Sequence, residues 1–346
     1  MRLSGKRVGR REILEKTGNI AQIAGARQYR LEGGYARNMK AIDVNTGSGL
    51  NFTVLPERGM DISLANYKGV NISYITSNGE TDPAFYEPEG IGWLRTFTGG
   101  LLTTCGLRSF GPPCNDENEE FGLHGRYSTI PAKQVCDSSH WEKDDYIVEV
   151  SGIIEECRIF GDKIRLTRTI RSKAGEKSFR IEDEIENFGF KAVPFMILYH
   201  FNIGFPMLDY GAELKVESSE CIPRDEEAKK GMKNKSFFSD PIKDFKEQCY
   251  TYKMKPGKSG RASATLVNRK LCGGLELRIG FNTDELPFMT QWKMMGQSEY
   301  VLGMEPCNVQ LDTRANHRAK KTLPFIEPGE KKNINLEVSV LEKDGF

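Results

Sequence analysis

Apolar and polar residues alternate along several segments of this chain, and this period of two constrains its fold more than any other feature. The alternation runs through 163–171, less regularly through 179–187, and again through 335–342. Successive side chains of a strand point to opposite faces, so the pattern predicts strands with one buried face. A polar connector at 173–177 contains a glycine and has the length of a hairpin loop. The segments 163–171 and 179–187 are therefore predicted to pair.

Helical periodicity is sparse by comparison. The segment 10–16 is the clearest helix candidate, and 241–249 is a second one with a single apolar stripe. The charged stretch 223–235 is typical of a solvated surface loop, and 35 glycines are spread along the chain as many turns would require. Many strands with few short helices indicate an all-β protein, a large antiparallel β-sandwich or barrel. Periodicity alone does not choose between these two.

Composition narrows the classes of partner. The chain has 346 residues and a formal net charge of +1, from 49 basic and 48 acidic residues, which gives no electrostatic reason to expect nucleic acid or an anionic membrane as partner. No segment reaches the ~20 apolar residues of a membrane helix, and the basic opening lacks the apolar run of a signal peptide. The eight cysteines include no Cys-x-x-Cys pair. We expect a cytoplasmic protein with buried thiols and no metal.

Three short segments carry ionisable side chains suited to moving protons on the oxygens of a cyclic sugar. They are 122–126 with His124, 198–202 with His200, and 303–308 with Glu305. His200 closes an apolar run, and burial there would lower the pKa of its imidazole. Glu305 follows apolar residues too, and a carboxylate in such surroundings either pairs or has its pKa raised, as in general bases. These three residues are the predicted catalytic groups.

Structural roles are the alternatives for the same residues. His124 could bind a loop carbonyl at a strand end, although the glycine that follows it lets backbone or ligand approach closely. His200 could be a core histidine with one backbone hydrogen bond. Glu305 could pair with Arg314 or Arg318. The remaining site candidates, predicted to bind substrate, are Arg58, Arg126, Trp292, Gln291 and Asn202. Trp93 is a further apolar surface against which a sugar could pack.

The order and spacing of the three segments resemble the active-site motifs of the aldose 1-epimerases, or galactose mutarotases. The ending 323–330 is also similar to that family's last motif, whereas the Gly-Arg after His124 and the His-Phe-Asn at 200–202 depart from its usual pattern. The chain thus resembles a divergent branch of poorly defined function within this superfamily, over most of 25–343. The resemblance implies a large β-sandwich, the supersandwich, as a single domain at 25–346. The segment 1–24 would be an N-terminal extension packing on that domain.

The resemblance also implies a reaction and the residues that perform it. The enzyme would interconvert the α and β anomers of a free sugar by opening and reclosing the ring, without metal or organic cofactor. Glu305 would take the proton of the anomeric hydroxyl, His200 would protonate the ring oxygen, and His124 would hydrogen-bond the sugar. The expected partner is a small carbohydrate, and assembly into a homo-oligomer is a further possibility that the sequence leaves open.

Two other functions stay open. The first keeps catalysis but changes the ligand to a phosphorylated or acidic sugar. Five arginines in or near the motif segments would bind it: Arg58, Arg108, Arg126, Arg314 and Arg318. The second is a non-catalytic carbohydrate-binding protein on the same concave face, because a fold does not decide a function.

Overall fold

Two large antiparallel sheets dominate the computed structural model, which describes residues 1–3, 6–257 and 259–343. The larger sheet follows the order β21-β22-β25-β26-β19-β10-β6-β5-β4-β3, with β7 beside β6. Its strands are β21 Ser218–Pro223, β22 Gln248–Met254, β25 Phe288–Met295, β26 Tyr300–Cys307, β19 Leu198–Ile203, β10 Leu102–Cys105, β6 Asp61–Tyr67, β5 Leu50–Leu55, β4 Lys40–Asn45, β3 Gly25–Arg30 and β7 Val70–Asn71.

The second sheet follows the order β13-β15-β16-β17-β28-β24-β23-β20, with β14 beside β15. Its strands are β13 Lys133–Asp137, β15 Asp145–Cys157, β16 Lys163–Lys173, β17 Ser178–Asn187, β28 Lys331–Glu342, β24 Leu275–Asn282, β23 Arg261–Asn268, β20 Glu213–Val216 and β14 His140–Glu142. The main apolar core draws on both sheets. The expected all-β sandwich is confirmed.

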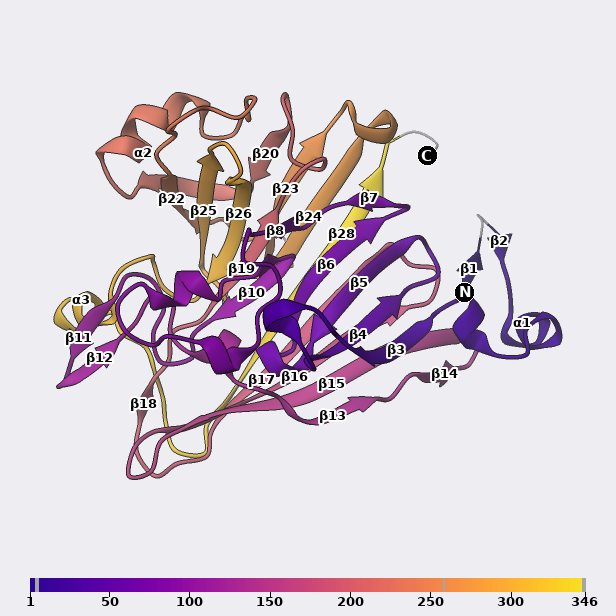
Figure 1. The fold of residues 1–346 in the computed structure, drawn as a ribbon, viewed down its shortest axis with the longest axis horizontal. Helices are drawn as coiled ribbons and strands as arrows, with labels where there is room; N and C mark the ends of the chain where they lie inside the picture. Colours follow the sequence, from indigo (N-terminus) through magenta and orange to yellow (C-terminus); the bar gives the residue numbers. More distant parts are fainter. Residues whose placement is uncertain (4–5, 258, 344–346) are drawn as a thin grey trace.

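Short ladders and helices complete the described chain. The ladders pair β1 Arg2–Leu3 with β2 Lys6–Arg7, β8 Tyr74–Ile75 with β9 Gly99–Gly100, β11 Cys114–Asp116 with β12 Glu119–Phe121, and β18 Val193–Pro194 with β27 Phe325–Ile326. The α-helices are α1 Arg10–Lys16, α2 Glu226–Gly231 and α3 Arg314–Ala319. They lie toward the ends of the molecule, α1 at one end and α2 and α3 at the other (Figure 1).

The local predictions have mixed outcomes. β16 and β17 pair in register as expected, and α1 covers the predicted helix at 10–16. The helix expected at 241–249 is wrong, because its last residues belong to strand β22. The stretch 223–235 contains α2, whose N-cap Asp225 accepts a hydrogen bond from the Ala228 amide, so it is not simply a loop. Residues 4–5 of the predicted extension at 1–24, and residues 344–346 of the predicted domain at 25–346, lie outside the described residues.

The strand alternation separates two environments on the larger sheet. In β19, Tyr199 and Phe201 belong to the core between the sheets, whereas Leu198 belongs to a second apolar cluster on the opposite face. This second cluster includes Trp93 and Phe97 from the long connection between β8 and β10. The connection therefore covers the outer face of the strands, and that face carries the candidate site.

Candidate active site

Neighbouring strands of the larger sheet bring together residues that are far apart in the chain. His200 lies on β19 and Glu305 on the adjacent β26, and the register of these strands sets Leu198 opposite Cys307 and Phe201 opposite Met304. Because side chains alternate, His200 and Glu305 share the outer face with Leu198 and Cys307. The Nε2 of His200 lies 3.2 Å from the Oε1 of Glu305. Two of the three predicted catalytic groups are thus in contact.

Both members of this pair are buried, with 4% of His200 and 2% of Glu305 exposed. Burial lowers the pKa of His200 well below its usual value, and the nearby His124 lowers it further. Burial raises the pKa of Glu305 well above its usual value, with Glu247 adding to the rise and Arg224 opposing it. Each shift disfavours the charged form of its own group. The pair therefore carries a single proton over a wide range of pH.

His124 lies in a tight loop that faces the same pocket. Its backbone is in the left-handed region, with φ of 59°, and its amide donates to the carbonyl of Gly111. The following Gly125 is required, because a Cβ there would lie 2.2 Å from the carbonyl oxygen of Ser109. The His124 ring lies 5.8 Å from the His200 ring and 4.8 Å from Trp93, measured between ring centroids. Burial lowers the pKa of His124 to about 4, so this imidazole is neutral at neutral pH.

A pocket of about 380 Å³ is open between these groups. Within the described chain, three buried side-chain atoms at this pocket make no hydrogen bond, namely Nδ1 of His124, Nδ1 of His200 and Oε1 of Glu305. Oε1 of Glu305 lies 3.2 Å from Nε2 of His200 but without the geometry of a hydrogen bond. Buried polar atoms without partners are costly, so these three atoms are available to a polar ligand. The pocket is lined by Ile91, Trp93, Leu94, Phe97, Gly111, Pro112, Pro113, Leu123, His124, His200, Arg224, Glu247, Cys249, Thr290, Trp292, Glu305 and Leu311.

Trp292 of β25 forms an aromatic wall of this pocket. Its ring centroid lies 5.5 Å from that of His200 and 6.4 Å from that of Phe97, and its Nε1 donates to Oε2 of Glu247 at 2.8 Å. Trp93 is also in the lining. Indole faces of this kind pack against the C–H surface of a sugar ring.

Two other predicted binding residues lie outside the pocket lining. Gln291 precedes Trp292, so its side chain points to the opposite face of β25, where it accepts from the Tyr252 hydroxyl and donates to the carbonyl of Lys235. Asn202 is fully buried and donates to the carbonyls of Gly99 and His200. Neither belongs to the pocket lining. The structure gives Gln291 and the amide nitrogen of Asn202 hydrogen bonds within the protein in place of the predicted substrate contacts, whereas Oδ1 of Asn202 has no partner among the described residues.

The arginines predicted to bind substrate also lie outside the lining. Arg58 is buried and donates to the carbonyl of Thr81 at 2.8 Å, and burial lowers its pKa to about 10. Arg126 is exposed, with its guanidinium 5.8 Å from the ring centroid of Tyr86. Arg58 lies in the turn between β5 and β6, and Arg126 follows Gly125, whose φ is 75°. Neither position reaches the pocket.

The remaining arginines of the anionic-sugar hypothesis are held by carboxylates elsewhere. Arg108 contacts Glu119 and Asp162 at 2.6–2.7 Å. Arg314 and Arg318 both contact Asp116 at 2.7 Å. Glu305 therefore does not pair with Arg314 or Arg318, as the structural alternative would require.

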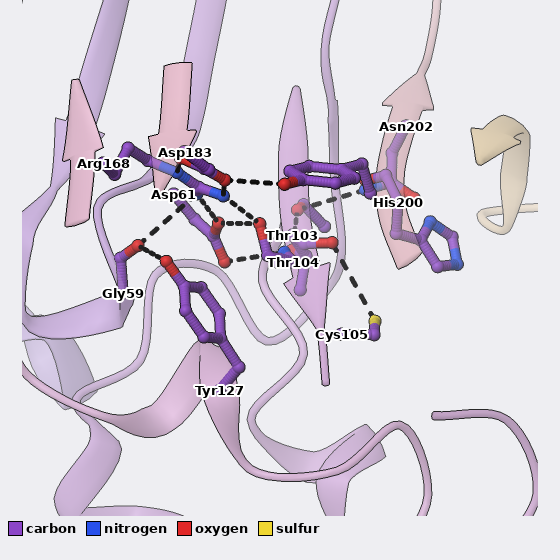
Figure 2. A network of polar contacts seen from close by, with 12 residues as sticks. Gly59, Asp61, Thr103, Thr104, Cys105, Tyr127, Arg168, Asp183, His200 and Asn202 are labelled. Carbon is purple, nitrogen blue, oxygen red and sulfur yellow. Dashed lines mark hydrogen bonds and ion pairs between the residues drawn. The ribbon is translucent and has the colours of Figure 1, made fainter. Parts of the chain in front are cut away.

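A buried polar network holds the strand that carries His200 (Figure 2). Arg168 of β16 donates to both oxygens of Asp183 of β17, at 2.9 and 2.7 Å, and to Oδ1 of Asp61 at 2.8 Å. Tyr199, the residue before His200, donates from its hydroxyl to Asp183 at 2.7 Å. The ring of His200 points away from this network in Figure 2, because consecutive strand residues face opposite sides. The network thus anchors β19 from its inner face and leaves His200 free to face the pocket.

Sequence reasoning missed several lining residues, of which Arg224 and Glu247 are the charged ones. Arg224 follows β21 and Glu247 precedes β22, at the two ends of the connection between these strands. Neither was signalled by the sequence, because Arg224 lies in the stretch expected to be a solvated loop and Glu247 in the segment expected to be a helix. Phe97 and Cys249 carried no chemical signal at all.

The described residues contain no group of three or more His, Cys, Asp or Glu side chains placed to hold a metal ion. The eight cysteines are free thiols. None of the helices in the described ranges is long and apolar enough to cross a membrane.

Comparisons with known proteins concern the fold. One similar solved structure is that of a "putative aldose 1-epimerase" from Klebsiella pneumoniae subsp. pneumoniae MGH 78578. It has a TM-score of 0.85 and 26% identity, over 91% of this chain and 83% of that chain. A galactose mutarotase-like protein from Clostridium acetobutylicum has a TM-score of 0.64 and 13% identity, covering 93% and 100% of the two chains.

The galactose 1-epimerase of Lactobacillus acidophilus NCFM shares the fold at a TM-score of 0.58 and 13% identity, covering 93% of this chain and 100% of that one. No curated protein sequence matches significantly. A family model described as a domain of unknown function, DUF4432, matches residues 36–340. The chain therefore belongs to the DUF4432 family and has a galactose mutarotase-like fold.

Proposed function

We propose that the protein is an aldose 1-epimerase-like isomerase that interconverts the α and β anomers of a free aldose. The observation that carries this proposal is the contact between His200 and Glu305, 3.2 Å apart, in a pocket with unpartnered polar atoms. The anomeric oxygen and the ring oxygen of an aldose are bonded to the same carbon. An acid and a base that act on these two oxygens must therefore be near neighbours, as His200 and Glu305 are.

In the proposed reaction, the ionised Glu305 removes the proton of the anomeric hydroxyl while the protonated His200 delivers a proton to the ring oxygen. The C1–ring oxygen bond breaks and an aldehyde forms. Rotation about C1–C2 presents the other face of the carbonyl, and the reverse proton transfers close the ring. No net proton is gained or lost.

The burial of the pair fits this cycle. After ring opening, Glu305 is protonated and His200 is neutral, and this is the neutral state that burial of both groups favours. The same one-proton pair therefore serves both halves of the reaction. The neutral His124 is placed to hydrogen-bond a sugar hydroxyl, and Trp292 to pack on the ring. General acid and base catalysis each contribute ~10²–10⁴ in rate.

The test is an exchange assay on Glu305→Gln. Two-dimensional exchange NMR or polarimetry on a freshly dissolved single anomer measures interconversion for a panel of free aldoses. We expect the variant to lose ~10²-fold or more of the wild-type rate, because the base is gone while the shape of the side chain stays. Glu299→Gln is the matched control, since Glu299 is exposed just before the same strand.

Binding is measured on the same samples. Trp93 and Trp292 line the pocket, and the chain has three tryptophans, so tryptophan fluorescence reports occupancy. Retained binding with lost exchange supports the proposed base. Wild-type protein that binds aldoses but exchanges none of them supports the carbohydrate-binding alternative instead.

A further inference from the structure

Arg224 and Glu247 form a charged pair at the wall of the pocket, opposite in sign and held in a defined orientation. Nη1 of Arg224 donates to Oε1 of Glu247 at 2.8 Å, and Oε2 of Glu247 accepts from Nε1 of Trp292 at 2.8 Å. Nε of Arg224 donates to Asp225 at 2.8 Å, and Asp225 is itself fixed as the N-cap of α2. The pair is thus tied both to the aromatic wall and to the insertion.

The pair keeps hydrogen-bonding capacity for a ligand. Within the described chain, Nη2 of Arg224 makes no hydrogen bond, and each carboxylate oxygen of Glu247 accepts one bond and has a further lone pair. Both side chains are partly exposed, at 34% and 47%. A guanidinium donor beside a carboxylate acceptor can bind adjacent hydroxyl groups of a sugar, which are each both donor and acceptor.

The place of the pair in the sheet separates it from the reacting groups. The strand order β22-β25-β26-β19 puts two strands, β25 and β26, between the strand that begins next to Glu247 and the strand of His200. Trp292, on β25, lies between Glu247 and His200. A sugar whose C1 is at Glu305 and His200 would therefore present its more distant hydroxyls to Arg224 and Glu247.

The charges of the lining oppose an anionic ligand. Arg224 already contacts two carboxylates, those of Glu247 and Asp225. Burial lowers the pKa of both pocket histidines and so disfavours their charged forms. Among the lining residues there is no lysine, and much of the rest is apolar. A phosphate or carboxylate would meet Glu247 without an unneutralised cation nearby.

We propose that Arg224 and Glu247 bind the hydroxyls of the sugar distant from C1, and that they make the pocket selective for uncharged aldoses over phosphorylated or acidic ones. This inference rests on the proposed function of the pocket and names the substrate class.

The test measures binding in the Glu305→Gln background, where turnover does not interfere. The probes are D-glucose and D-galactose, each with its 6-phosphate and its uronic acid, titrated against tryptophan fluorescence. We expect Arg224→Met to weaken binding of the neutral sugar by roughly 10- to 100-fold, as loss of a hydrogen bond to a charged group does. Arg269→Met is the matched control, because Arg269 pairs with Glu213 at 2.8 Å on an exposed surface outside the pocket lining.

Glu247→Gln tests the charge argument separately. Removing this carboxylate leaves Arg224 less neutralised, so the affinity for the 6-phosphate and the uronic acid should rise by about 10-fold or more relative to the neutral sugar. An unchanged ratio overturns the selectivity mechanism. Three results would overturn the inference as a whole. They are a wild-type preference for the anionic probes, failure of all six probes to bind, and a change in neutral-sugar affinity under about twofold in Arg224→Met.

Exchange rates on the same sugars separate this inference from the proposed function. Binding that depends on Arg224 without any anomer exchange keeps the inference and defeats the epimerase proposal. Exchange that is retained in Arg224→Met with unchanged KM defeats the inference and keeps the epimerase.

Discussion

Asp183→Asn tests whether the buried network supports the active site, and its cost follows from the contacts. Asp183 is 3% exposed and accepts three hydrogen bonds, from Nε and Nη2 of Arg168 and from the Tyr199 hydroxyl, at 2.7–2.9 Å. The amide preserves the shape but removes the charge and turns one acceptor into a donor facing Arg168. Arg168 is fully buried and keeps Asp61 as its remaining carboxylate partner.

Breaking one partner of a buried ion pair costs about 3–5 kcal/mol, less than the sum of the separate hydrogen bonds because these are not additive. We expect a loss of that size in the free energy of unfolding, measured by urea denaturation with circular dichroism. The neighbouring Glu184→Gln is the matched control. Glu184 faces outward from the same strand and pairs with Lys331 at 2.7 Å at the surface, where ion pairs contribute little.

The same variant should lower anomer exchange in the fraction that remains folded, since the hydrogen bond from Tyr199, one residue before His200, then goes to a neutral amide oxygen and is weaker. Tyr199→Phe should show this effect with a smaller loss of stability, because it removes one hydrogen bond and leaves the Arg168–Asp183 contact in place. Equal, small stability losses for Asp183→Asn and Glu184→Gln would refute the role assigned to the network.

Three further predictions concern the reacting groups. The exchange rate should be nearly constant around neutral pH. At low pH the His200–Glu305 pair takes up a second proton and lacks a base, and at high pH it loses its only proton and lacks an acid. The lowered pKa of His200 moves the acidic limb to lower pH, and the raised pKa of Glu305 moves the basic limb to higher pH. A steep change in kcat between about pH 6 and pH 8 would contradict the shared proton. His200→Asn should reduce kcat by ~10²-fold or more, whereas His124→Asn should act more on KM, which steady-state kinetics would resolve; equal small effects would argue against an acid at His200. Exhaustive chelation should leave exchange unchanged, and activity that is lost and then restored by one added metal would overturn a mechanism of proton transfer alone.

The fold class was predictable from the sequence because the strand pattern is local. The alternation at 163–171 and 179–187 needs only neighbouring residues, and the short connector makes these strands pair, as β16 and β17 do. The same pattern did not reveal that Arg168 and Asp183 lie in the buried rows, directly opposite each other. Their burial depends on the larger sheet, whose residues Asp61 and Tyr199 contact them from the opposite side of the core.

The candidate site was likewise predictable in part from the sequence. His124, His200 and Glu305 stood out in the sequence as ionisable groups beside apolar runs and glycines, and Trp292 as a sugar-facing surface. The contact of His200 with Glu305 required β19 and β26 to be neighbours, which is a property of the sheet order. Gln291 was predicted to reach the pocket because it precedes Trp292. That prediction is wrong, since consecutive strand residues face opposite sides of a sheet.

Arg224 and Glu247 show what only the tertiary structure decided. They lie 23 residues apart at the two ends of the connection between β21 and β22, and the pairing of these strands brings them to one wall. Local propensity and hydrophobic pattern act over a few residues, so they determine strands and their buried faces. A pocket is closed by pairings between strands and by loops that cover a sheet, and those contacts depend on the packing of the whole chain.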